Sequence, residues 1–231
     1  MLVSSPRRDA VVARLAGRIV GLDRGRRARV AVDGVDGAGK STLADELASR
    51  VEAQGRAVVR ASVDSFHRPR VHRYRLGRTS AEGFYRDSYD YDRLNEVLVR
   101  PFSPGGSGRY RAAMFDHVTD LPVTAPEQRA DPDAVLILDG IFLHRPELDG
   151  SWDFSIFLQV GFGVSLSRCA SRGSMSDDPH APSNRRYVDG QRLYLREARP
   201  WERATVVVDN TDLAAPVIVE PAGSALAGIG Q

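Results

Sequence analysis

The sequence is poor in lysine and cysteine and has no long apolar run. Cys169 is the only cysteine in 231 residues, which excludes an intramolecular disulfide and fits a reducing compartment such as the cytoplasm. No run of about 18 apolar residues occurs, so no membrane span is expected. The N-terminal stretch lacks the apolar core and small-residue cleavage site of a secretory signal, and no Cys/His cluster has the spacing of zinc ligands.

Excess charge of one sign is also lacking. The 32 basic residues are nearly balanced by 30 acidic ones, which gives a net charge of +2 and predicts a mixed, solvated surface. A nucleic-acid-binding protein would more commonly carry a clustered positive excess, so no nucleic-acid partner is expected. One segment, residues 67–78, does concentrate five arginines with two histidines. Contact with an anionic substrate and contact with nucleic acid both remain open for that segment.

The only lysine, Lys40, lies inside a complete phosphate-binding motif, G-x-x-x-x-G-K-[ST]. The other 31 basic residues are arginines, so lysine is kept where a compact ammonium must reach the β- and γ-phosphates of a nucleotide. The glycines allow the backbone N–H groups to surround a phosphate, and the Ser41 hydroxyl is a ligand for Mg²⁺. Thr42 is expected to open the following helix. The predicted nucleotide-binding residues are Gly34, Val35, Asp36, Gly37, Ala38, Gly39, Lys40, Ser41 and Thr42.

Strand and helix patterns alternate along the chain, which predicts an α/β fold with a mainly parallel sheet and helices on both faces. The whole chain, 1–231, is expected to form a single domain with a mobile lid at 173–184 and a loose tail at 221–231. The expected helices are 7–22, 42–54, 90–99, 164–172 and 185–199, and the expected strands are 29–33, 57–64, 109–115, 134–138, 154–160 and 205–209.

Two aspartates stand at the ends of predicted strands, where the phosphate loop also begins. Ligands of parallel α/β sheets bind at the carboxyl ends of the strands, so Asp64, Asp139 and the loop are expected to meet. Asp64 is the candidate to orient or deprotonate an acceptor hydroxyl, or to hold Mg²⁺ through water. Asp139 is the candidate for a second carboxylate at the metal. Turn or cap formation is the alternative role for each.

Arginines flank the predicted lid. Arg168 and Arg172 are four residues apart on one predicted helix, and Arg185 and Arg186 follow the lid. Mobile arginines that close over a transferring phosphoryl group would stabilise its charge, whereas solvated surface arginines are the alternative.

Other classes of nucleotide-binding protein lack support. A GTPase of the Ras type would need the lysine of an Asn-Lys-x-Asp motif, and a transporter ATPase would need a Leu-Ser-Gly-Gly-Gln motif; both are absent. A small-molecule kinase remains. A nucleotide-binding regulator without transferase activity is the alternative from a different class.

Four stretches resemble the uridine kinase and phosphoribulokinase group of P-loop kinases, and the resemblance spans roughly 29–209. They are residues 30–42, Asp64-Ser65-Phe66-His67, residues 135–141, and Met114-Phe115-Asp116-His117-Val118-Thr119, which is similar to the Tyr-Asp-Phe-x-Ser/Thr stretch of uridine–cytidine kinases. The resemblance implies a three-layer P-loop kinase fold with ATP and Mg²⁺ as cofactors. It also implies Asp64 as the base on a 5′-hydroxyl, Asp139 at the metal and Phe115 at the nucleobase, with Arg168 and Arg172 as lid arginines.

The sequence departs from this group in the residues that would recognise the acceptor. Asp120 stands where the group has a base-reading histidine, and His117 lies two residues before Thr119 instead. The Phe-Asp pair that holds the ribose is replaced by residues 84–87, which offers Tyr85 and Asp87 as substrate contacts, with Asp90 as the alternative carboxylate. We therefore expect a kinase for a primary hydroxyl of a small metabolite, with a pyrimidine nucleoside as the leading acceptor. Pantothenate, a sugar phosphate or another ribosyl compound are the alternatives, and a homo-oligomer is compatible with the sequence.

Overall fold

The computed structural model describes residues 5–173, 176, 178 and 181–219. It contains a central six-stranded sheet in the order β10-β9-β8-β1-β7-β2. Five of its strands, β1, β2, β7, β8 and β9, run parallel to one another. The sixth strand, β10, is antiparallel to its neighbour β9. The expected α/β fold with a mainly parallel sheet is confirmed. The strands are β1 Ala28–Gly34, β2 Val58–Ser62, β7 Val135–Gly140, β8 Phe154–Gln159, β9 Val206–Asp209 and β10 Val217–Val219.

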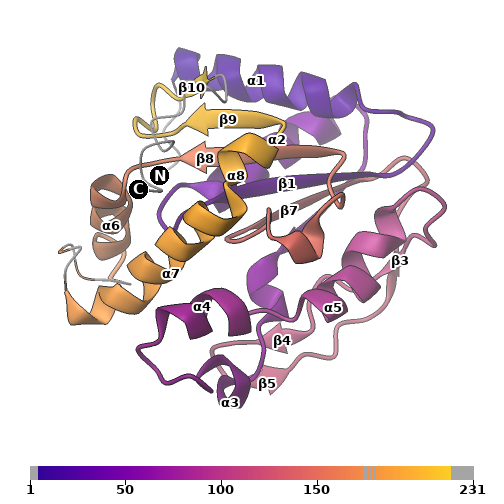
Figure 1. Ribbon diagram of the computed structural model, residues 1–231. Helices are drawn as coiled ribbons and strands as arrows, with labels where there is room; N and C mark the ends of the chain where they lie inside the picture. The colour runs from indigo at the N-terminus through magenta and orange to yellow at the C-terminus, as the bar shows by residue number, and fades with distance from the viewer. Residues whose placement is uncertain (1–4, 174–175, 177, 179–180, 220–231) are drawn as a thin grey trace.

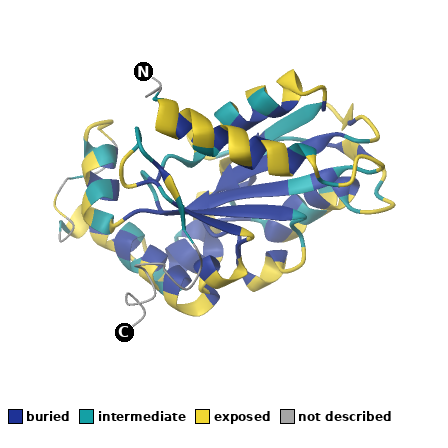
Figure 2. Ribbon diagram, turned by 90° about the horizontal axis from the view of Figure 1, so that it is seen from above, coloured by how far each residue is buried: buried dark blue, intermediate teal, exposed yellow. Residues whose placement is uncertain are grey.

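Helices lie on both faces of the sheet (Figure 1). α1 and α2 pack together over one face, and α4 packs against α7 on the other side. Seen from above, the buried strands lie between helices whose outer surfaces are exposed (Figure 2). The helices are α1 Pro6–Val20, α2 Lys40–Ala53, α3 Arg70–Arg73, α4 Ala81–Asp87, α5 Tyr91–Leu94, α6 Phe162–Ala170, α7 Pro182–Ala198 and α8 Pro200–Arg203.

The middle strands are buried because they are covered on both faces. Every residue of β7 and β8 is buried, which explains their nearly continuous apolar sequences. α1 begins where Ser5 caps the helix by accepting a hydrogen bond from the Arg8 N–H, followed by Pro6 in the first turn. In the described part of the chain, no helix is long and apolar enough to cross a membrane.

The expected strand at 109–115 is wrong. Its two ends belong to separate antiparallel strand pairs: β3 Arg109–Tyr110 pairs with β6 Gln128–Arg129, and β4 Phe115–Asp116 pairs with β5 Leu121–Pro122. Between them, the Arg111 N–H donates to the Val97 carbonyl and the Met114 N–H donates to the Ser65 carbonyl. Because these donors are bonded to other segments, the backbone cannot continue one ladder.

Other elements differ from expectation in length or were not expected. The helix expected at 90–99 is α-helical only over α5 and continues as a π-helical turn over Asn95–Val99. α3, α4 and β10 were not expected. The lid at 173–184 falls partly, and the tail at 221–231 wholly, outside the described residues. Within the lid range, α7 already begins at Pro182.

Candidate functional site

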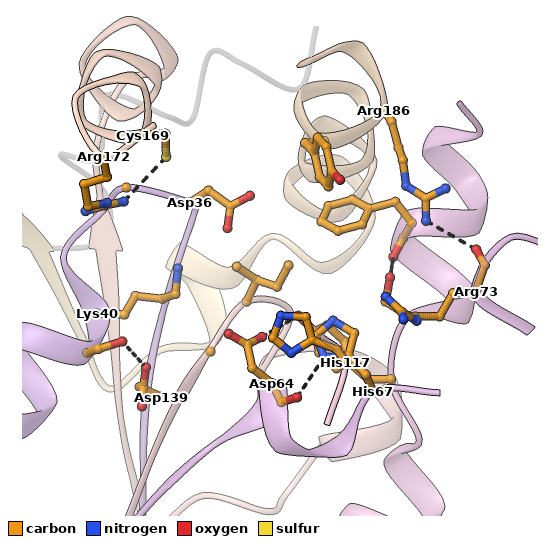
Figure 3. Close-up of a pocket in the computed structure, with 18 of the residues that line it drawn as sticks. Asp36, Lys40, Asp64, His67, Arg73, His117, Asp139, Cys169, Arg172 and Arg186 are labelled. Atoms are coloured by element: carbon orange, nitrogen blue, oxygen red, sulfur yellow. Dashed lines mark hydrogen bonds between the residues drawn. The ribbon is translucent and has the colours of Figure 1, made fainter. Parts of the chain in front are cut away.

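A cleft of about 490 Å³ opens at the carboxyl ends of β1, β7 and β2 (Figure 3). The phosphate loop and α2 form one side of it, and α3, α4, α7 and the β4–β5 hairpin form the other. It brings together residues expected from the sequence with residues that were not. The lining residues are Asp36, Gly37, Gly39, Lys40, Ser41, Thr42, Asp64, His67, Arg73, Tyr74, Phe84, Ser88, Tyr89, His117, Asp139, Gly140, Ile141, Cys169, Arg172, Arg186 and Tyr187.

The phosphate loop needs its glycines for two separate reasons. Gly37 and Gly39 have φ values of +71° and +91°, in the left-handed region that side chains disfavour. A Cβ on Gly37 would also lie 2.3 Å from the Ser165 carbonyl oxygen. α2 then begins at Lys40, two residues before the predicted Thr42, and Gly39 supplies no side-chain cap. The first N–H groups of the helix are therefore directed to the anion-binding side of the loop.

Side chains from outside the loop hold its carbonyl groups. The Ser165 hydroxyl donates to the Asp36 carbonyl (2.5 Å), Arg168 Nη1 to the Gly37 carbonyl (3.3 Å) and Asn210 Nδ2 to the Ala38 carbonyl (2.7 Å). Arg168 also donates to two carbonyls that follow β9 and does not line the cleft. Arg168 thus lies behind the loop in this structure, whereas Arg172 lies on the cleft side (Figure 3).

Lys40, Ser41 and Asp139 lie together at the loop end of the cleft. Lys40 Nζ donates to the Val35 carbonyl at 2.9 Å. The Ser41 hydroxyl donates to Asp139 Oδ2 at 2.6 Å, and Arg60 pairs with Asp139 Oδ1 at 3.0 Å. A hydroxyl and a carboxylate are the hard oxygen ligands that Mg²⁺ uses beside nucleotide phosphates, so these two residues fit the metal. The ion pair with Arg60 orients the buried Asp139 carboxylate.

Two carboxylates face the centre of the cleft. Asp64 lies in the 3-10 turn after β2, and Tyr89 donates a hydrogen bond to its Oδ1 at 3.0 Å. Burial, together with the charge of Asp64, raises the pKa of Tyr89. The phenol therefore stays protonated, and its O–H donates the hydrogen bond to Asp64. Burial also raises the pKa of Asp36, against the lowering effect of Lys40, and Asp64 raises it further. Gln191 Nε2 donates to the Asp36 carboxylate at 3.1 Å.

The far side of the cleft is aromatic and basic. The rings of His67 and His117 stack with centroids 4.7 Å apart. Arg73 of α3 and Arg186 of α7 reach the same side (Figure 3), and both guanidinium groups lie over the ring of Tyr74. Burial lowers the pKa of His67, which keeps its imidazole neutral near pH 7.

Three predicted acceptor contacts do not line the cleft. Tyr85 is 2% exposed and packs in the core against Phe142. Asp87 is buried and pairs with Arg75 at 3.2 Å, and Phe115 is buried in β4.

Several lining residues had no predicted role at the site. Asp120, noted in the sequence as a departure, does not line the cleft but pairs with the lining residue Arg73 at 3.0 Å and accepts from the Arg70 N–H. Arg73 and His67 belong to the arginine-rich segment, and His67 also ends the Asp64-Ser65-Phe66-His67 stretch that resembles the kinase group. Nothing in the sequence pointed to Tyr89.

The family model of the phosphoribulokinase and uridine kinase family matches residues 30–176. The match covers the phosphate loop, Asp64, the β4–β5 hairpin, Asp139 and α6. The chain belongs to this family of small-molecule kinases. A search of curated protein sequences gives no significant match.

Solved structures share the fold. One is described as a possible uridine kinase from Bacillus stearothermophilus, with 24% identity and a TM-score of 0.68, over 88% of this chain and 98% of that one. Another is a provisionally assigned fructose transport system kinase from Silicibacter sp. TM1040, with 24% identity and a TM-score of 0.62, over 79% of this chain and 93% of that one. A D-glycerate 3-kinase from Cryptococcus neoformans has 15% identity and a TM-score of 0.56, over 79% and 88% of the two chains. Their names cover different acceptors, so the shared fold does not select one.

Proposed function

We propose that the whole chain acts as one kinase domain that transfers the γ-phosphoryl group of ATP to a hydroxyl group of a small metabolite. One observation carries the proposal: Lys40, the Ser41–Asp139 pair and Asp64 come from three neighbouring strand ends and line one cleft. This arrangement combines a phosphate-binding loop, oxygen ligands for Mg²⁺ and a carboxylate for the acceptor, which is what phosphoryl transfer requires. The single cysteine supports a reducing compartment such as the cytoplasm as the enzyme's location.

Each residue has a defined part in the transfer. The loop N–H groups and Lys40 hold the β- and γ-phosphates. Asp64, held by Tyr89, accepts the proton of the acceptor hydroxyl as its oxygen attacks the γ-phosphorus. The bond from the γ-phosphorus to the bridging oxygen breaks, and ADP leaves. Arg172 is placed at the loop side of the cleft to stabilise charge on the transferring group.

Mg²⁺ would be held by Ser41, with Asp139 and Asp64 as the neighbouring carboxylates. When bound, it neutralises charge on the phosphate oxygens.

A pyrimidine nucleoside is the acceptor that the family resemblance favours. His117, stacked on His67, supports it as an aromatic surface for a base. Tyr85, Asp87 and Phe115 would contribute to acceptor binding only after a rearrangement, because they do not line the cleft. Pantothenate and sugar phosphates remain alternative acceptors.

The test is ADP release from ATP·Mg²⁺ by the purified protein with a panel of acceptors. The panel contains uridine, cytidine, other nucleosides, pantothenate, ribulose 5-phosphate and D-glycerate. Lys40→Ala is the blank, and we expect it to lower kcat by about a hundredfold or more, because the phosphates lose their positioned cation. Nucleotide binding that depends on Lys40, without ADP release for any acceptor, would instead indicate a nucleotide-binding regulator.

A further inference from the structure

Arg73 is an unusual residue for a protein surface cleft. Its side chain lines the cleft, yet the residue is only 8% exposed. Its Nη2 pairs with Asp120, but its Nε is buried with no hydrogen-bond partner among the described residues. Leaving a buried donor unsatisfied is unfavourable, especially on a charged group, so a donor in this state on a residue that lines the cleft points to a ligand oxygen.

Arg186 reaches the same side of the cleft from α7. Its Nη1 and Nη2 donate to the carbonyls of Gly77, Arg78 and Arg73 at 3.0–3.3 Å. These partners are neutral, and none of the described carboxylates forms an ion pair with Arg186. Burial, and to a smaller degree the charge of Arg73, lower the pKa of Arg186. A nearby anion would relieve both effects.

The two guanidinium groups are held by aromatic rings. Arg186 lies 4.8 Å and Arg73 lies 5.6 Å from the centre of the Tyr74 ring. Both side chains are therefore fixed before any ligand binds, which favours recognition of a planar carboxylate or of a phosphate.

The other ionisable groups on this side of the cleft do not oppose an anion there. His67 is neutral near pH 7, and Asp120 is bonded to Arg73 and to the Arg70 N–H. Asp87, the carboxylate expected to hold a ribose, is buried against Arg75 and does not line the cleft. Asp64 lies between these arginines and the phosphate loop in Figure 3. A hydroxyl at Asp64 and an anionic group at the arginines are thus compatible with a single small molecule.

We propose that the acceptor carries a carboxylate or a phosphate group, which binds to Arg73 and Arg186 while its hydroxyl lies at Asp64. The proposal rests on the proposed kinase function, because it identifies the far side of the cleft as the acceptor subsite. It selects an anionic metabolite over a neutral nucleoside.

The experiment compares ligands that differ only in the anionic group. The full-length protein, saturated with ADP·Mg²⁺, is titrated calorimetrically with D-glycerate and glycerol, pantothenate and pantothenyl alcohol, ribulose 5-phosphate and ribulose, and with uridine and cytidine. We expect an anionic member to bind at least tenfold more tightly than its neutral partner. The pair that shows this difference tells a carboxylate acceptor from a phosphate acceptor.

Variants locate the binding group. Arg73→Gln and Arg186→Gln should each weaken the anionic ligand by about ten- to a hundredfold and leave its neutral partner unchanged. Arg75→Gln is the matched control, since Arg75 is in the same segment but is 63% exposed and does not line the cleft. The ligand pairs are also measured on the unaltered protein, so the test does not depend on the variants folding.

Equal binding within every pair, binding of uridine or cytidine alone, or binding of no ligand would overturn the proposal. ADP release with the same ligands is measured separately. Selective binding of an anionic ligand without ADP release would leave the subsite standing and contradict the kinase function. ADP release only with neutral acceptors would support the kinase function and contradict the anionic subsite.

Discussion

The two halves of the cleft are built in different ways. The half proposed to bind the nucleotide, called here the donor half, is a contiguous loop, residues 34–42, whose path is set by glycines and whose backbone N–H groups are available to phosphates. The acceptor half is assembled from side chains that lie far apart in the sequence, such as His67, Arg73, His117 and Arg186. Backbone N–H groups can bind the phosphates of any nucleotide, whereas recognition of a particular acceptor requires particular side chains.

The halves also differ in what holds them. The carbonyls of the donor loop are bonded by Ser165, Arg168 and Asn210, which come from α6 and from the segment after β9. The acceptor half is held by stacking and ion pairs among its own members, such as Arg73 with Asp120 and His67 with His117. Changes that act on one half should therefore leave the other half's ligand affinity intact.

The largest effect is expected at the boundary between the halves. Asp64→Asn should lower kcat by about 10²–10⁴-fold, because the amide cannot accept the hydroxyl proton. Its oxygen can still accept the bond from Tyr89, so the affinity for ATP should change little. Steady-state rates and titration with a non-hydrolysable ATP analogue would check this. Asp92→Asn is the control, an exposed aspartate outside the cleft. A kcat near that of the unaltered protein would remove Asp64 from the proposed role of base.

A smaller and more selective effect is expected behind the donor loop. Asn210→Ala removes the donor to the Ala38 carbonyl and leaves that buried oxygen unsatisfied, a loss of about 1–3 kcal/mol. We expect the KM for ATP to rise by about tenfold with the KM for the acceptor unchanged. Asn95→Ala is the matched control, because this amide donates to the Glu147 carbonyl away from the cleft. An equal rise in both KM values would show that the halves are coupled.

This division explains how far the sequence predicted the molecule. The parallel sheet follows from apolar runs such as 135–138 alternating with helical patterns, and the donor half follows from one motif with fixed spacing. Asp64 and Asp139 were placed correctly at the cleft because parallel strands end at one edge of a sheet. These inferences need only local pattern and a general rule of the fold.

The acceptor half could not be predicted in the same way. Tyr85 and Asp87 were chosen by their place in a short segment, but α4 directs its neighbour Phe84 to the cleft and buries both of them. Which face of a short helix points inward depends on tertiary packing, here against α7. Arg186 was expected to flank a lid, and its contact with the Arg73 carbonyl appears only once α3 and α7 are side by side.

The smallest effect concerns the response of stability to pH, which should differ in sign between the halves. Burial lowers the pKa of His67 below 6.5, with His117 and Arg73 adding to the shift and Asp64 opposing it. The unfolded chain then binds more protons than the folded one, so stability is lost as the pH falls through about 6.5. In the donor half, the raised pKa of Asp36 makes the folded state bind more protons. The contribution of Asp36 to stability therefore decreases as the pH rises from 3.8.

The contribution of His67 is isolated by urea unfolding of the unaltered protein and of His67→Gln at pH 5.5 and 7.5, with exposed His72→Gln as the control. His67→Gln should lose less stability on acidification than the unaltered protein, because it lacks the titrating imidazole. An equal loss in all three proteins would mean that the acceptor half does not sense pH through His67.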